Sequence, residues 1–158
     1  MGICIQPLEK HYIDELAAWH HRQWQHLDRS VNENTRRTGL AAHCTTTELP
    51  MTFIAFEGDE LVGNICLVAE EVSNRPQYTP WISRVYVSTE HRGKSIGRRL
   101  IEHAKSALQQ QGHPELYLLT EDKADYYAQL GWEKVEEYQL NGLTVDIMKI
   151  ALAKNCSK

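Results

Sequence analysis

A basic segment in the middle of the chain has the residue types needed to bind an anion. Four basic side chains occupy eight consecutive positions: Arg92, Lys94, Arg98 and Arg99. The segment follows the apolar, β-rich residues 81–87 and precedes a helical pattern, so it lies at a predicted helix N-terminus. The first backbone N–H groups of a helix have no partner within the helix, and the dipole makes that end partly positive. The pattern therefore predicts an anion site.

The small residues of this segment, Gly93, Ser95 and Gly97, would let a diphosphate approach the backbone. Basic residues at a helix N-terminus oppose the dipole, which favours a bound anion that offsets them. The alternative is an ordinary strand–turn–helix with a solvated basic first turn. Two common phosphate-binding motifs, the P-loop G-x-x-x-x-G-K-[ST] and the Rossmann G-x-G-x-x-G, do not occur in the sequence.

The segment resembles the coenzyme A signature of the GNAT superfamily, [QR]-x-x-G-x-[GA] after a Val-x-Val strand. The residues that carry the resemblance are Val85, Tyr86 and Val87, then Arg92-Gly93-Lys94-Ser95-Ile96-Gly97. At the fourth position the family usually has glycine, whereas this chain has Ser95, whose hydroxyl could donate to a phosphate. We expect ordinary helical dihedral angles at Ser95, because a positive φ would cost serine about 1 kcal/mol or more relative to glycine.

A second motif about thirty residues downstream resembles the same family. A predicted strand at residues 116–119 is followed by Tyr126-Tyr127-Ala128-Gln129-Leu130-Gly131-Trp132, which fits [FY]-Y-x-x-x-G-[FW]. Arg75-Pro76 and Thr79-Pro80-Trp81 also resemble a bacterial subgroup of the family. The order and spacing of the two motifs are more specific than either motif alone.

The resemblance implies an N-acetyltransferase that moves the acetyl group of acetyl-CoA directly to a primary amine. Acetyl-CoA would lie where the fourth and fifth strands splay apart, and the edge of the fourth strand would bind the pantetheine arm. The implied coenzyme contacts are Val85, Tyr86, Val87, Arg92, Gly93, Lys94, Ser95, Ile96, Gly97 and Arg98. Tyr127 matches the family tyrosine that acts as general acid on the thiolate, and a tyrosine with a pKa of about 10 is protonated at neutral pH. The alternative is that Tyr127 is a packed aromatic residue, as we expect for Tyr126.

The general base is not fixed by the motifs. Some family members use a glutamate on the fourth strand, where this chain has Trp81, which could instead form the amine pocket wall or belong to the core. A protonated amine cannot attack, so another group must take its proton. The candidates are Glu70 and Glu71 near the end of the third strand, His91, or a chain of water molecules. The two glutamates could also be simply solvated.

The length of the chain and its alternating strands and helices predict an α/β (α+β) fold in a single domain covering residues 1–158. Periodicity predicts strands at 3–6, 51–56, 61–69, 81–87, 116–119, 132–140 and 143–150. It predicts helices at 8–24, 95–111 and 123–130, with a further helix opened by a capping box from Ser30 to Glu33. A strand–helix–strand unit implies one parallel pair, and hairpins such as the one at Asn141-Gly142 imply antiparallel pairs. The sheet should be mixed, mostly antiparallel, with six to seven strands. The resemblance implies the GNAT acyl-CoA N-acyltransferase fold, in which strands 4 and 5 splay apart.

The composition limits the kinds of partner and ligand that the protein is expected to bind. The net charge of −4, from 17 basic and 21 acidic residues, argues against nucleic acid. The absence of a signal-peptide pattern and of a long apolar run predicts a cytoplasmic protein without a membrane partner. His20, His21 and His26 lack metal-pair spacing, so we expect no metal and expect them to pack or to line the acceptor cleft.

The acceptor is expected to be a small-molecule or peptide amine, with the first two helices and residues 72–80 shaping its pocket. The protein is expected to be a monomer or a homodimer. Two other functions are compatible with the sequence: an acyl-CoA-binding sensor or partner module without catalysis, and transfer of a longer acyl chain.

Overall fold

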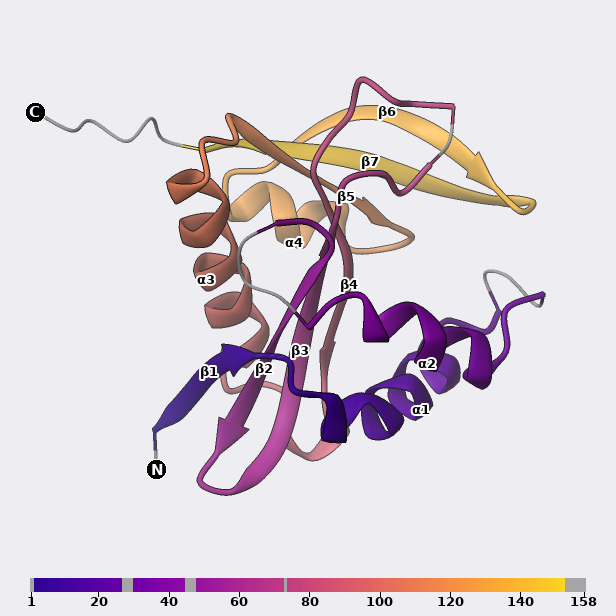
Figure 1. Cartoon of the computed structure of the whole chain (residues 1–158). Helices are drawn as coiled ribbons and strands as arrows, with labels where there is room; N and C mark the ends of the chain where they lie inside the picture. Colours follow the sequence, from indigo (N-terminus) through magenta and orange to yellow (C-terminus); the bar gives the residue numbers. More distant parts are fainter. Residues whose placement is uncertain (1, 27–29, 45–47, 73, 153–158) are drawn as a thin grey trace, which may run out of the picture.

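Seven strands form one sheet in the computed structural model, which describes residues 2–26, 30–44, 48–72 and 74–152 (Figure 1). The strands are β1 (Ile3–Pro7), β2 (Met51–Glu57), β3 (Glu60–Val68), β4 (Trp81–Val87), β5 (Glu115–Thr120), β6 (Glu133–Leu140) and β7 (Leu143–Ala151). They lie in the order β1-β2-β3-β4-β5-β7-β6, and every neighbouring pair is antiparallel except β4–β5. The predicted mixed, mostly antiparallel sheet is confirmed.

Helices cover both faces of this sheet. They are α1 (Ile13–Trp24), α2 (Glu33–Ala41), α3 (Ile96–Gln110) and α4 (Ala124–Gln129), with short 3-10 helices η1 (Lys10–Tyr12) and η2 (Thr89–His91). Figure 1 shows α3 on one side of β2, β3 and β4, with α1 and α2 on the other side. The buried side chains divide in the same way, one apolar cluster lying under α3 and a second under α1.

The best-predicted helix is α3, because its apolar residues recur every three or four positions. Its buried residues are Ile96, Leu100, Ile101, Ala104 and Leu108. Such a stripe occupies one face of a helix, and here that face packs on the sheet. Beyond its end, Gly112 has a φ of 90°, a conformation that glycine adopts without steric cost.

The two strands that should hold the coenzyme separate as predicted. β4 and β5 are paired only through Trp81 with Tyr117 and Ile82 with Leu118. β4 then continues to Val87, and β5 continues alongside β7 to Thr120. Beyond Ile82, the edge of β4 that faces β5 therefore no longer pairs with β5. This is the splay that the family resemblance implied.

Two helix starts differ from the prediction. The helix after residue 30 is capped by Asn32, whose Oδ1 accepts a hydrogen bond of 2.8 Å from the Thr35 N–H, so the capping box from Ser30 is wrong. Asparagine caps as well as serine and lies closer to the helix. The first helix begins at Ile13 instead of residue 8, because the Leu8 N–H donates to the Thr52 carbonyl and holds the chain to the sheet.

The remaining predicted elements agree with the structure to within one residue at each end. The hairpin between β6 and β7 turns at Asn141 and Gly142, whose φ angles of 51° and 86° are those of a type I′ turn. Residue 73 lies outside the described residues, and the rest of the predicted loop from 72 to 80 contains no helix or strand.

Candidate active site

A hollow of about 340 Å³ lies where β4, η2 and the start of α3 meet. Its lining residues are Val87, His91, Arg92, Gly93, Ser95, Ile96, Gly97, Arg98 and Tyr126. Most of the predicted coenzyme contacts are therefore brought together at one place. The first turn of α3 directs its unpaired N–H groups and its positive dipole end toward this place, which suits a diphosphate.

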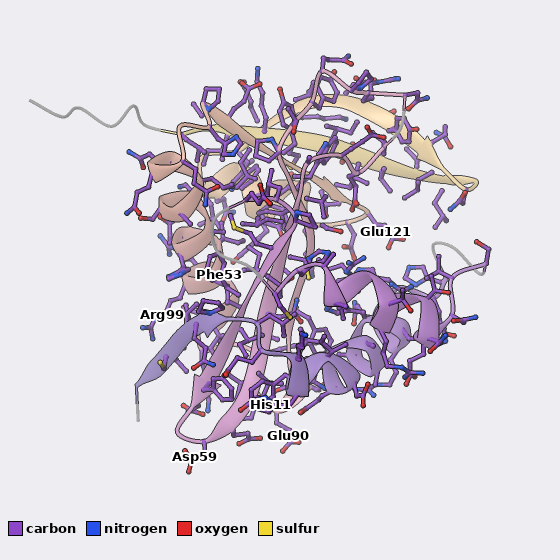
Figure 2. The ribbon with its side chains drawn as sticks, viewed as in Figure 1. His11, Phe53, Asp59, Glu90, Arg99 and Glu121 are labelled. Carbon is purple, nitrogen blue, oxygen red and sulfur yellow. The ribbon has the colours of Figure 1, made fainter. Side chains whose placement is uncertain are left out.

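The basic residues of the segment do not all surround the hollow. Arg92 lines it, donates from Nε to the Val87 carbonyl at 2.8 Å, and has its guanidinium carbon 5.4 Å from the Tyr86 ring centroid. Lys94 instead lies 3.5 Å from Glu57, and Arg99 donates over 3.4 Å to the carbonyl of Ile3. Figure 2 shows Arg99 beside β1, on the side covered by α3. Of the four basic residues, Arg92 and Arg98 line the hollow, whereas Lys94 and Arg99 do not.

The backbone at Ser95 also differs from the prediction. Its φ of 63° and ψ of 21° are left-handed, not helical, and its side chain makes no capping hydrogen bond. The chain leaves extended Arg92, turns through Gly93 at φ 84°, and needs a second positive φ before Ile96 can start the helix. This path explains why the family usually has glycine at the position of Ser95.

Replacing Ser95 by glycine is expected to stabilise the protein. Removing Cβ from a left-handed residue should raise the free energy of unfolding by about 1 kcal/mol. For a chain of this length that corresponds to a melting temperature about 2–4 °C higher. Ser106→Gly is the matched control, because Ser106 is exposed inside α3 and glycine there should lower stability by about 0.5 kcal/mol. A lower melting temperature for Ser95→Gly would contradict the assignment of strain.

The side chains of β4 alternate between the two cores. Val85 and Val87 pack against the cluster under α3, whereas Tyr86 is buried on the opposite face, with its ring centroid 4.9 Å from that of Trp19. Contacts from these residues to a ligand in the splay would therefore come from their backbone groups at the open edge of β4. Trp81 is fully buried and donates to the Tyr78 carbonyl, so it belongs to the core rather than to a pocket wall.

Two adjacent tyrosines on α4 have different environments. Tyr127 is half-buried, packs against the cluster under α3, and has its ring centroid 5.9 Å from that of Trp132. Burial, with a smaller effect of Tyr126, raises the pKa of Tyr127 to about 12. Tyr126 is 45% exposed and lines the hollow, so the prediction that it is packed is wrong. Neighbouring helical residues project about 100° apart, and only one of the two can face the core.

The three candidate bases lie in different places. Glu70 is exposed, two residues beyond β3. Glu71 is half-buried and accepts a hydrogen bond of 3.2 Å from Ser83 Oγ. Burial raises the pKa of Glu71 to about 7, against the opposing effects of Arg84 and Ser83. His91 borders the hollow, where its Nδ1 lies 2.6 Å from Ser88 Oγ and its Nε2 lies 3.4 Å from Glu60.

The histidines of the first helix do not form a common site. His20 is fully buried against Asn64, and burial lowers its pKa to about 3. His26, beyond the end of α1, lies 3.0 Å from Glu121, which directly follows β5. Among the described residues, no group of three or more His, Cys, Asp or Glu side chains is placed to hold a metal ion. Within the same residues, no helix is both long and apolar enough to cross a membrane.

Sequence reasoning missed two residues on β4, Ser83 and Arg84. The available signal was a polar pair within an otherwise apolar strand. The sequence also did not predict a role for Arg75. This residue forms two hydrogen bonds to the Glu136 carboxylate, at 3.1 and 2.9 Å, and so holds the loop before β4 to β6.

Comparisons with known proteins identify the family. The sequence matches the acetyltransferase (GNAT) family over residues 12–132. The structure is similar to yncA, a putative acetyltransferase from Salmonella typhimurium solved with acetyl-CoA, at a TM-score of 0.77 and 17% identity over 100% of this chain and 98% of that one. It is also similar to an aminoglycoside 6'-acetyltransferase type Ii, at a TM-score of 0.74 and 18% identity over 96% and 99% of the two chains.

A further similar structure is the ribosomal-protein-S18-alanine N-acetyltransferase from Escherichia coli, at a TM-score of 0.69 and 18% identity over 99% and 98% of the two chains. A search of curated proteins found no match. The match to the family covers both sequence motifs, the splayed strands and the hollow at the start of α3. This chain therefore belongs to the GNAT acetyltransferase family and is an acyltransferase.

Proposed function

We propose that the protein transfers the acetyl group of acetyl-CoA directly to a primary amine of a small-molecule or peptide acceptor. The observation that carries the proposal is the opening between β4 and β5, which has the hollow of α3 at one side; Tyr126 of α4, the neighbour of Tyr127, lines that hollow. These features supply a place for a diphosphate, a free strand edge for an extended amide-containing arm, and an acid for the leaving thiolate.

The coenzyme would be held mainly by backbone groups. In this proposal the diphosphate accepts hydrogen bonds from the N–H groups between Gly93 and Arg98, with the guanidinium groups of Arg92 and Arg98 adding positive charge. The pantetheine arm extends the sheet at the open edge of β4, from Val87 back to Val85, as an added strand would. Tyr86 contributes its backbone there, since its side chain is buried on the other face.

The chemical step needs one base and one acid. The neutral amine attacks the thioester carbonyl, the C–N bond forms, and the C–S bond breaks to release a thiolate. We assign Glu71 to take the first proton, which the ammonium loses before it attacks, and Tyr127 to give its phenolic proton to the thiolate. The second proton, which the nitrogen loses after the C–N bond forms, returns Tyr127 to its phenol form. A carboxyl with a pKa of about 7 can accept a proton near neutral pH.

Glu71→Gln is expected to lower kcat by about 10²- to 10⁴-fold, the usual contribution of a general base. Only the carboxylate form accepts a proton, so the kcat of the native enzyme should rise with pH and level off above about 7, the pKa of Glu71. The variant should lack this inflection. The measurement is a pH profile of thiol release at saturating acceptor. Glu70→Gln is the control and should retain the native profile; an unchanged profile in Glu71→Gln would exclude Glu71 as the base.

The function itself is tested by assaying thiol release from acetyl-CoA in the presence of single primary amines. We expect release that depends on the amine and a product heavier by one acetyl group. Binding of acetyl-CoA without release for any amine or peptide tested would contradict the proposal and indicate a binding module.

A further inference from the structure

Arg84 is a half-buried charge without a counter-ion among the described residues. It lies in the middle of β4, its Nε atom is buried without a hydrogen-bond partner, and no ion pair holds its guanidinium within the described residues. Burying an unpaired charge is costly, and proteins usually retain one only where it has a use. The guanidinium has five N–H donors in a planar fork that matches a carboxylate.

An irregularity in the sheet determines the face on which Arg84 lies. Arg84 pairs with Cys66 and Ile82 pairs with Leu67, so Ser83 has no partner residue on β3. Such a bulge changes the alternation of side chains along a strand. Ile82 and Val85 face the core under α3, whereas Arg84 acts electrostatically on His20, which is buried on the side of α1. The bulge therefore turns the guanidinium toward the side of the sheet covered by α1 and α2.

The titratable groups around Arg84 do not neutralise it. The residues on which its charge acts include His20, His43 and Glu71. Burial lowers the pKa of both histidines, so they are neutral at pH 7 and bring no charge. The Nδ1 atom of His20 is itself buried without a hydrogen-bond partner. Glu71 is the one acid in this set, and it makes no ion pair with Arg84 among the described residues.

We infer that the acceptor carries a carboxylate close to its amine, as a free amino acid does, and that Arg84 binds this carboxylate. This inference rests on the proposed function, in which Glu71 takes the proton of the amine. A guanidinium and a carboxylate close enough to act on each other are the complement of an ammonium and a carboxylate in one small molecule. Polyamines, aminoglycoside-like amines and the N-termini of proteins lack a carboxylate beside the amine and would leave Arg84 unpaired.

The test compares free L-amino acids with their carboxamides as acceptors, using thiol release at saturating acetyl-CoA. For the best amino acid, kcat/KM should exceed that of its amide by about 30-fold or more, the usual loss when a buried charge pair is broken. Arg84→Gln should remove this preference by slowing the amino acid far more than the amide, whose rate should fall only because the pKa of Glu71 rises without the Arg84 charge. Arg84→Lys should recover only part of it, because lysine keeps the charge without the fork. Acetyl-CoA binding, measured by calorimetry, should be the same in all three proteins.

Any one of the following outcomes would overturn the inference. One is equal use of acids and amides; another is an equal loss for both acceptors in Arg84→Gln. The third is a melting temperature of Arg84→Met well below that of the native protein, which would make the guanidinium a structural group; we expect an equal or higher value. Turnover of polyamines or protein N-termini alone would overturn the inference and leave the proposed function standing. Acetyl-CoA binding without turnover of any amine would contradict both the inference and the proposed function.

Discussion

Gly97→Glu is expected to weaken acetyl-CoA binding by about 100-fold or more, since like charges brought together cost several kcal/mol. Gly97 lies in the first turn of α3 and lines the hollow that we assign to the diphosphate. A Cβ at this position would meet Val87 at 3.6 Å and Val85 at 3.9 Å, which are ordinary contacts. The fold should therefore accept the side chain while its carboxylate repels the ligand. Calorimetric titration with acetyl-CoA measures the effect.

Gly97→Ala is the control for this experiment. It adds the same Cβ contacts without a charge, and alanine also fits the signature at this position. Because Gly97 is helical, alanine should raise the free energy of unfolding by about 0.5–1 kcal/mol, and binding should persist. Native-like binding by Gly97→Glu, or equal loss in both variants, would remove the diphosphate from this hollow.

Tyr127→Phe is expected to lower kcat by about 10²- to 10⁴-fold and to leave the affinity for acetyl-CoA nearly unchanged. The change deletes one hydroxyl and keeps the ring that packs against Trp132 and the cluster under α3. With its pKa raised to about 12, the native phenol carries its proton throughout the neutral range, so the loss should be similar at pH 6 and pH 8. Steady-state thiol release together with calorimetry separates turnover from binding.

Tyr126→Phe provides the matched comparison on the same helix. Tyr126 is exposed and lines the hollow, so losing its hydroxyl should change kcat little. If Tyr127→Phe retained native kcat, or if both variants lost activity equally, Tyr127 would not be the general acid.

Periodic features of the sequence predicted the fold well. The apolar stripe of α3 and the Asn141-Gly142 turn depend on neighbours within a few positions, so local pattern was sufficient for both. The splay could be predicted only through the family resemblance, because it depends on how far β4 and β5 remain paired. No residue type marks where a ladder ends.

The site was predicted less completely, for reasons of tertiary structure. Lys94 and Arg99 have partners in Glu57 and at the Ile3 carbonyl, which are distant in the chain, so their absence from the lining of the hollow could not be predicted locally. The left-handed angle at Ser95 follows from the path that joins β4 to α3.

The register of β4 on β3 explains why Arg84 was not predicted as a site residue. Simple alternation would place Arg84 and Ile82 on one face, and one unpaired residue, Ser83, reverses that assignment. Glu71 could be separated from Glu70 only once its hydrogen bond with Ser83 was known.

The central claim is direct transfer of an acetyl group from the coenzyme to an amine. Its most direct test is to follow the acetyl label of acetyl-CoA through a single turnover with an accepted amine, and then to separate protein from small molecules. Direct transfer should leave the label in the N-acetylated amine, in equal amount to the thiol released, with none on the protein. Label covalently bound to the protein, or label that stays on acetyl-CoA although the coenzyme is bound, would contradict it.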